Sequence, residues 1–335
     1  MKTDYDVIII GSGPAGASCA KHLIDNGVKT LIIEKRKLPR YKCCNGLLSK
    51  RSLDYIKDNF GQIPTNIYCK ISEVETKISK SGKGFLLLEG NNFKNILRDK
   101  FDHWLIKRSN VEIYEECRFI DLKKENEKIK IKCIYNNKEL EFICNFLIAA
   151  DGADSKIRKI IDKNYNIQKI GGFTIQNIYK MNNKSDDIED GFYYVILSKK
   201  YSNGGFSWML KKNDNLTLGT GWIKHDIDYL NNWISFVKDY YNLDIQLIRK
   251  ESGYINYFFN EDNLFYGKEN ILIIGEACGL MLPFGQGIPS ALYSGKYAGE
   301  AIINNKNNIY KCYKKLLQKE INLLKKSWEK GKIFN

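Results

Sequence analysis

The feature that most constrains the fold is a glycine turn between two short apolar runs near the start of the chain. Residues 5–10 (Tyr-Asp-Val-Ile-Ile-Ile) predict a buried parallel strand, which the turn Gly11-Ser-Gly13-Pro-Ala-Gly16 follows directly. A helix is expected as far as about Gly27, and residues 30–34 predict a second buried strand that ends on an acid. This order of elements is a βαβ unit, which favours a parallel sheet covered by helices.

The spacing of the glycines in this turn is typical of dinucleotide binding. Because glycine has no side chain, these residues allow a tight turn. They also let a pyrophosphate approach the free N–H groups and the positive dipole end of the helix. Glu34 is placed to accept the hydroxyl groups of an adenosine ribose. A turn with a purely structural role is disfavoured by the strand before it and the helix after it. The residues predicted to hold this part of the ligand are Gly11, Gly13, Pro14, Ala15, Gly16, Glu34 and Lys35.

Two later turns have a similar character. Asp151-Gly152-x-x-Ser155-x-x-Arg158 follows an apolar run, and so does Gly275-Glu276. A helix is expected to restart near Gly287-Ile288-Pro289, because proline suits the first turn of a helix. Turns of this kind at both ends of the chain predict one large cofactor that is held from both ends.

The middle of the chain predicts a second sheet. Residues 170–260 form short, aromatic-rich, alternating runs separated by Asn, Gly and Asp, which favours antiparallel strands. We therefore expect an α/β fold, in which a Rossmann-type domain with a parallel sheet carries an inserted antiparallel substrate domain. The first domain is expected to comprise residues 1–65, 93–165 and 265–335, and the second residues 66–92 and 166–264. Within the first, we predict a helix over residues 93–108 and a hairpin formed by residues 128–134 and 140–143.

Composition and charge limit the kinds of partner that the protein is expected to bind. The net charge of +14 raises nucleic acid or an anionic membrane as partners, but lysine dominates and no nucleic-acid-binding module is recognisable, so we expect no specific nucleic-acid binding. Nine scattered cysteines and three histidines show no metal-type spacing, so no metal site is expected and the thiols are expected to be reduced. Neither a signal peptide nor a membrane span is recognisable, so the predicted location is the cytoplasm.

The tail over residues 306–335 is rich in lysine and carries apolar residues at helical spacing. One interpretation is a surface helix packed on the core. The alternative is a basic amphipathic helix that also makes a peripheral contact with anionic lipid.

With these motifs in this order, the chain resembles the FAD-dependent group that includes aromatic hydroxylases and geranylgeranyl reductases. The resemblance covers the chain up to about residue 305. It implies that Gly275 and Glu276 hold the ribityl chain of FAD, although the group usually has Asp at the second position. It also implies that the helix after Gly287 and Ile288 points its N-terminus at the pyrimidine end of the flavin, where negative charge develops on reduction.

Finer features resemble the geranylgeranyl reductases in particular. The stretch Pro39-Arg40-Tyr-Lys42-Cys43-Cys44-Asn45-Gly46 is similar to a cofactor loop of that family, with Cys44 on the family cysteine. Arg98, followed by Phe101-Asp102-x-Trp104-Leu105, is similar to a family helix whose arginine lies near FAD. Phe206-x-Trp208 resembles a substrate-domain signature, although Leu210-Lys211 replaces its Phe-Pro. The cofactor-binding residues added by these turns and resemblances are Arg40, Cys44, Arg98, Asp151, Gly152, Gly275, Glu276, Gly287 and Ile288.

The resemblance implies an FAD-dependent oxidoreductase that reduces carbon–carbon double bonds of an apolar, isoprenoid or other lipid-like substrate by hydride transfer. Cys44 is the candidate proton donor, since Lys42 or Arg40 would favour its thiolate; its alternative role is that of a small residue in a cofactor loop. Phe206 and Trp208 either wall an apolar pocket or belong to an aromatic core.

Other activities stay open on the same scaffold. The alternative enzyme is a monooxygenase or halogenase acting on a small aromatic or natural-product substrate, and a third class is a flavin-bearing redox sensor without turnover. The chain has no second glycine fingerprint for a nicotinamide cofactor. Either NAD(P)H therefore binds without a dedicated domain, or another reductant supplies the electrons.

Overall fold

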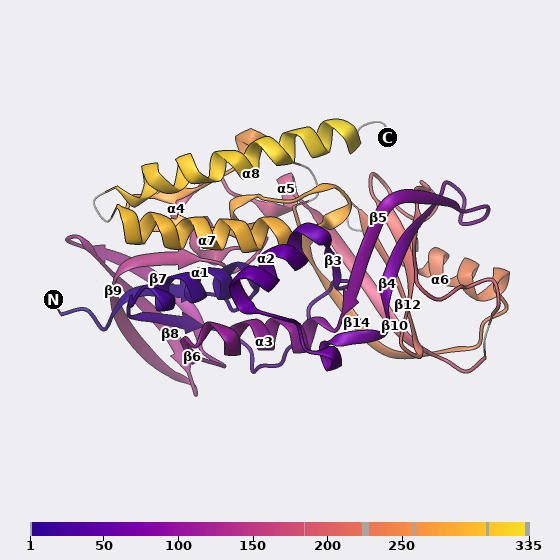
Figure 1. The fold of residues 1–335 in the computed structure, drawn as a ribbon, viewed down its shortest axis with the longest axis horizontal. Helices are drawn as coiled ribbons and strands as arrows, with labels where there is room; N and C mark the ends of the chain where they lie inside the picture. Colours follow the sequence, from indigo (N-terminus) through magenta and orange to yellow (C-terminus); the bar gives the residue numbers. More distant parts are fainter. Residues whose placement is uncertain (1, 184, 223–227, 257–258, 306–307, 332–335) are drawn as a thin grey trace.

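The fold is built on two eight-stranded sheets that lie at opposite ends of an elongated molecule (Figure 1). The computed structural model describes residues 2–183, 185–222, 228–256, 259–305 and 308–331. The predicted α/β fold, a parallel Rossmann-type sheet with a largely antiparallel sheet inserted, is confirmed.

The first sheet is parallel at its centre. Its strands run in the order β15 (Gly267–Lys268), β16 (Ile271–Ile273), β9 (Lys138–Ala149), β1 (Tyr5–Ile10), β2 (Thr30–Ile33) and β6 (Glu112–Tyr114). Val7 lies opposite Thr30 on one side and Phe146 on the other. The central strands are almost continuous runs of apolar residues because helices cover the sheet and both of its faces are buried.

One long strand joins the hairpin to the parallel sheet. The hairpin strands are β8 (Lys128–Tyr135) and the first half of β9, and β7 (Arg118–Glu125) pairs with β8 on its other side. The predicted hairpin is therefore correct, but its return strand does not stop at residue 143: β9 continues alongside β1 and ends at Ala149. This continuity places Asp151 and Gly152 beside the first glycine turn.

The second sheet is antiparallel except for one pair. The strand order is β14 (Ile245–Ile255), β10 (Gly172–Met181), β13 (Asn215–Trp222), β12 (Phe206–Lys212), β11 (Phe192–Ile196), β4 (Tyr68–Ser79), β5 (Leu86–Ile96) and β3 (Leu47–Ser49), and only β11 and β4 run parallel. Helix α6 (Asp228–Tyr240) packs on it through the buried Trp233 and Val237.

Two boundaries differ from the expected ones. The predicted helix over residues 93–108 begins later, as α3 (Arg98–Ser109), because residues 93–96 complete β5. Strand β3 and the end of β5 pair within the second sheet, although they lie outside residues 66–92 and 166–264. The division into two domains at those residue numbers stays a proposal.

The helices pack closely where glycine faces a neighbouring backbone. Besides α3, the helices before the second sheet's main run are α1 (Pro14–Asp25), α2 (Lys50–Phe60), α4 (Lys156–Ile161) and α5 (Ile167–Ile170), and those at the end of the chain are α7 (Ile288–Asn304) and α8 (Ile309–Gly331). A Cβ at Gly295 would lie 2.3 Å from the carbonyl oxygen of Ala15, so only glycine lets α7 approach α1 this closely.

A buried carboxylate fixes α8 on the layer below it. The Glu320 side chain accepts hydrogen bonds from Arg51 of α2 (2.9 Å) and Ser290 of α7 (2.7 Å). Because a buried charge is costly without partners, this cluster joins three helices at one point. No helix in the described part of the chain is long and apolar enough to cross a membrane.

Candidate functional site

The first glycine turn makes the end of β1 and the start of α1 unusually close. Gly11 has φ +108°, and a Cβ there would lie 2.4 Å from the carbonyl oxygen of Ala150. A Cβ at Gly16 would lie 2.1 Å from the carbonyl oxygen of Gly11. At Gly13, in contrast, the nearest atom would be Arg40 Nη2 at 4.0 Å. Gly11 and Gly16 are thus required by packing, whereas Gly13 leaves space beside the N-terminus of α1.

The Glu34 carboxylate lies at the end of β2 beside this turn and is only 4% exposed. It accepts hydrogen bonds from Ser12 Oγ (2.6 Å) and the Arg36 N–H (2.9 Å), and Arg40 Nε lies 3.3 Å from it. Burial acts to raise the pKa of this carboxyl, but the Arg40 guanidinium and the hydrogen bonds outweigh it and lower the pKa below its usual range. Glu34 is therefore an ionised acceptor at neutral pH.

A chain of alternating charges runs from Glu34 towards α3. Arg40 Nη1 lies 3.5 Å from Asp102, and Asp102 accepts two hydrogen bonds from Arg98, at 3.0 and 2.9 Å. Burial acts to lower the pKa of Arg98, but Asp102 and the Cys44 sulfur raise it, so the guanidinium stays charged. Lys35 is exposed beside Glu34 and takes no part in this chain.

Asp151 lies in the predicted second turn, between the end of β9 and the start of α4. Its Oδ2 accepts a hydrogen bond from the Lys156 N–H (2.8 Å), whereas its Oδ1 is buried and has no hydrogen-bond partner among the described residues. Burial raises the pKa of this carboxyl, and the hydrogen bonds offset only part of the effect. Gly152 has φ +82°, and a Cβ there would meet no atom within 4 Å. This turn thus contains one unpartnered acceptor among the described residues and a glycine with open space around it.

Arg158 joins the second turn to the third. Ser155 caps α4 by accepting the Arg158 N–H (3.0 Å), which fixes the start of the helix. The Arg158 guanidinium donates to the carbonyl oxygens of Ala277 (2.9 Å) and Asn263 (2.6 Å). Arg158 therefore connects the second turn to the third, although the two turns lie more than a hundred residues apart in the sequence.

The third turn lies against the first. Gly275 has φ +61°, its N–H donates to Ser294 Oγ (2.9 Å), and a Cβ there would lie 2.9 Å from Ala15 Cβ. The next residue, Glu276, accepts the Asn256 N–H at 3.3 Å and lies 3.6 Å from Lys42 Nζ. The first and third turns thus lie together, as the prediction of one cofactor held by both turns requires.

Helix α7 begins beside this turn without a side-chain cap. Gly287 occupies the cap position, Ile288 is the first helical residue and Pro289 follows. The first N–H groups of α7 are therefore available to an external acceptor or to negative charge.

The Cys44 loop, residues 39–46, lies on the side of the site that faces the second sheet. Cys44 is half-buried, and its sulfur accepts the Gly46 N–H (3.3 Å). It lines a cavity of about 210 Å³ together with Arg98, Gln176, Lys212 and Arg249, which come from α3, β10, β12 and β14. Gln176 is 3% exposed, and its Oε1 has no partner among the described residues. The cavity is thus polar and lies where the Cys44 loop and the start of α3 meet the second sheet.

Phe206 and Trp208 lie in a separate aromatic cluster. Their ring centroids are 5.7 Å apart, and Phe284 lies 5.8 Å from Phe206. Trp208 is only 5% exposed, and neither side chain lines the cavity beside Cys44. Their role in binding substrate stays a prediction.

The structure brings most of the predicted residues together at one site. It also places there residues that the sequence did not reveal. Ser12, Asp102 and Asn256 orient the predicted charged groups through hydrogen bonds, and Gln176 and Lys212 line the cavity. Asp102 stood in a quoted motif, so its four-residue spacing from Arg98 was a usable signal. The others reach the site from distant elements, and no local pattern marks them.

The donors and acceptors of the site fit FAD. The open space at Gly13 beside the uncapped start of α1 suits a pyrophosphate, and the ionised Glu34 suits ribose hydroxyls. The uncapped start of α7 suits the electron-rich pyrimidine end of a flavin. Because the first and third turns pack against each other, the described residues match a dinucleotide held at both turns.

Comparison with known proteins supports FAD as the cofactor. The family model described as FAD binding domain matches residues 4–215. The digeranylgeranylglycerophospholipid reductase of Methanocella arvoryzae is 27% identical over 326 residues, which cover 91% of this chain and 79% of the relative. A geranylgeranyl bacteriochlorophyll reductase-like structure from Thermoplasma acidophilum has a TM-score of 0.79 at 22% identity, covering 96% and 83% of the two chains. Aklavinone-11 hydroxylase in complex with FAD and aklavinone has a TM-score of 0.70 at 14% identity, covering 90% and 63%.

The fold and the site define an FAD-dependent oxidoreductase with the two-sheet architecture of the flavin hydroxylases. The chain belongs to the FAD binding domain family, and it is similar to digeranylgeranylglycerophospholipid reductases over most of its length. The predicted cofactor, enzyme class and family resemblance are therefore confirmed.

Gly13 offers a test of the cofactor position. In Gly13→Ala the added methyl group meets protein only at 4.0 Å, so the free energy of unfolding of the apoprotein should change by no more than about 1 kcal/mol. FAD affinity should fall at least about tenfold, since the methyl group occupies the space beside the start of α1. Flavin fluorescence titration measures the affinity and denaturant unfolding the stability. In the control Gly16→Ala, the clash at 2.1 Å should instead destabilise the apoprotein. Wild-type affinity in Gly13→Ala would contradict this placement.

Glu34 should make stability depend on pH. Because its folded-state pKa is lowered, its contribution is complete above the unfolded value of 4.5 and is lost as the pH falls through the folded value. Glu34→Gln should therefore lower the free energy of unfolding by about 1–3 kcal/mol at pH 7, and the difference should shrink below pH 4.5. Urea titrations of the apoprotein across this range measure it. Glu141→Gln, at an exposed ion pair with Lys130, should show little change at any pH.

Proposed function

We propose that this FAD-dependent oxidoreductase reduces carbon–carbon double bonds of an isoprenoid lipid. The observation that carries the proposal is the similarity, over 91% of the chain, to a relative named digeranylgeranylglycerophospholipid reductase. The position of Cys44 supports it, because the thiol lines a cavity between the cofactor residues and the second sheet. The half-buried Phe206 and Phe284 of the aromatic cluster offer apolar surface for part of such a substrate.

Reduction of an alkene requires a hydride at one carbon and a proton at the other. FAD in its reduced form supplies the hydride. The chain must supply the proton, and Cys44 is the side chain in the cavity that we assign to this role. Arg98, which contacts the Cys44 sulfur, would hold the thiolate that remains after proton transfer. NAD(P)H or another reductant then returns the flavin to its reduced form.

This assignment predicts the behaviour of the reduced protein. When FAD-loaded protein is reduced with dithionite under anaerobic conditions and mixed with a geranylgeranyl glycerolipid, the flavin should be reoxidised and the lipid should gain two hydrogen atoms per double bond. Cys44→Ala should slow the reoxidation about 100-fold, because a general acid contributes at least this much. Stopped-flow absorbance and lipid mass spectrometry measure the two quantities.

The adjacent Cys43 supplies the control. Its thiol lies 3.7 Å from Thr174 Oγ1 and does not line the cavity, and burial raises its pKa to about 12. Cys43→Ala should therefore leave the reoxidation rate close to that of the wild type. Reoxidation only in oxygen, with a hydroxylated or halogenated product, would replace the reductase by the monooxygenase or halogenase alternative. Unchanged turnover in Cys44→Ala would remove Cys44 from the reaction.

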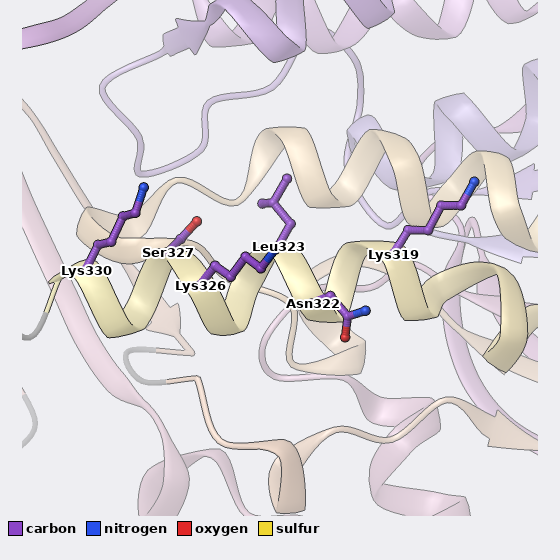
Figure 2. A pocket seen from close by; sticks show the side chains of 6 residues that line it. All are labelled: Lys319, Asn322, Leu323, Lys326, Ser327 and Lys330. Atoms are coloured by element: carbon purple, nitrogen blue, oxygen red, sulfur yellow. The ribbon is translucent and has the colours of Figure 1, made fainter.

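We further propose a cytoplasmic protein that reaches its lipid substrate at an anionic membrane surface through α8. The exposed face of this helix carries Lys319, Lys326 and Lys330 around the half-buried Leu323, beside a hollow of about 300 Å³ (Figure 2). Clustered lysines next to an apolar side chain are the composition of an interfacial helix. The inner face is held by Glu320, so the contact would use α8 in its folded position.

Liposome co-sedimentation tests this surface. Replacing Lys319, Lys326 and Lys330 together by Glu should reduce binding to phosphatidylglycerol vesicles at least about tenfold, since each lysine near an anionic surface contributes about 1 kcal/mol. The matched control replaces the exposed Lys80, Lys138 and Lys199 by Glu and makes the same change in net charge on other elements. Equal loss in both variants would indicate a general charge effect, and no loss in either would exclude the contact.

A further inference from the structure

Lys212 is a half-buried cation that the reaction proposed above does not use. It is the last residue of β12, and its ammonium donates to the carbonyl oxygens of Asn45 (3.1 Å) and Ile96 (2.6 Å). These carbonyls belong to the Cys44 loop and to the strand end that precedes α3. Within the described part of the chain, Lys212 has no carboxylate at salt-bridge distance, so two neutral carbonyl groups are its partners.

These bonds hold the turn that carries Cys44. Gly46, with φ +72°, donates its N–H to the Cys44 sulfur, and a Cβ at Gly46 would lie 2.3 Å from the Ile96 carbonyl oxygen and 3.0 Å from Lys212 Nζ. The turn is therefore packed directly against the lysine. An ammonium has three N–H groups and two are used here, so the third remains for the cavity that Lys212 and Cys44 both line.

Four ionisable groups surround the ammonium. Cys69 from β4, Cys44 from the loop, Arg98 from α3 and Glu251 from β14 all act on its charge. Burial has the largest effect and lowers the pKa of Lys212; the two sulfurs and Glu251 oppose this change, and Arg98 adds to it. The amine thus releases a proton more readily than an exposed lysine does.

We propose that Lys212 is a positioning residue that holds the Cys44 turn and returns a proton to the Cys44 sulfur during turnover. This inference rests on the proposed role of Cys44 as proton donor. After the Cys44 S–H bond breaks and its proton forms a C–H bond on the substrate, the thiolate takes a proton from the Lys212 ammonium. The neutral amine then takes a proton from solvent water, so the protein returns to its initial protonation state and each reduced double bond consumes one hydride and one solvent proton.

Two readouts test the two roles in FAD-loaded protein. The first is the pH at which iodoacetamide modifies Cys44 half-maximally, followed by mass spectrometry in a Cys43→Ser background without substrate. Removing the positive charge in Lys212→Met should move this midpoint up by about one pH unit, whereas Lys212→Arg should keep it. The second readout is the anaerobic rate of alkene reduction. Lys212→Arg should slow it at least about tenfold, because a guanidinium keeps its proton.

Lys211 provides the matched control. It is the neighbour on β12, its side chain points to the opposite face of the strand, and it pairs with Asp190 at 3.0 Å. Lys211→Met should leave both readouts unchanged, and flavin absorbance in every variant confirms that the site is assembled.

Each outcome decides one part of the inference. An unchanged alkylation midpoint in Lys212→Met would overturn the positioning role, and parental turnover in Lys212→Arg would overturn the proton return. If the parent protein reduces no alkene, the proposed function fails and the proton return fails with it. The alkylation midpoints still decide the positioning role in that case, because they require no turnover.

Discussion

Buried charge is the constraint on which the cofactor site depends. Glu34, Arg40, Asp102 and Arg98 form a chain of alternating sign, and because their side chains are largely buried, each charge would be costly without its partner. Because the chain runs from the end of β2 to the start of α3, it fixes two elements relative to each other. It also places a guanidinium against the Cys44 sulfur. Electrostatic pairing thus connects the adenosine end of the site to the residue proposed for the chemistry.

Close backbone approach is the second constraint. The first and third glycine turns touch through Ala15, which lies against Gly275 and Gly295. A side chain at Gly275 would push the third turn away from α1, and one at Gly295 would push α7 away from α1. Arg158 adds the second turn by bonding the carbonyl oxygen of Ala277. Since packed interiors tolerate little added volume, these contacts make the three motifs one unit even though the chain places them far apart.

Strands and turns could be predicted from the sequence wherever the residues of a single segment indicate its structure. The buried strands before Gly11 and Asp151, the hairpin and the acid Glu34 were all predictable, because periodicity and turn residues report burial directly. The start of α3 was not. Phe93 and the residues after it fit a helical period, but pairing with β4 extends β5 to Ile96, and such long-range pairing overrides local propensity.

The sequence by itself determined the cofactor and the type of fold, since the glycine spacing and the acid eighteen residues after it constrain the local backbone whatever surrounds them. Only the tertiary structure decided which side chains face Cys44. Gln176 and Lys212 come from the second sheet, and nothing near them in the sequence distinguishes them from surface residues. Their position follows from strand register and from the way the second sheet meets the Cys44 loop, and both depend on contacts between residues far apart in the chain.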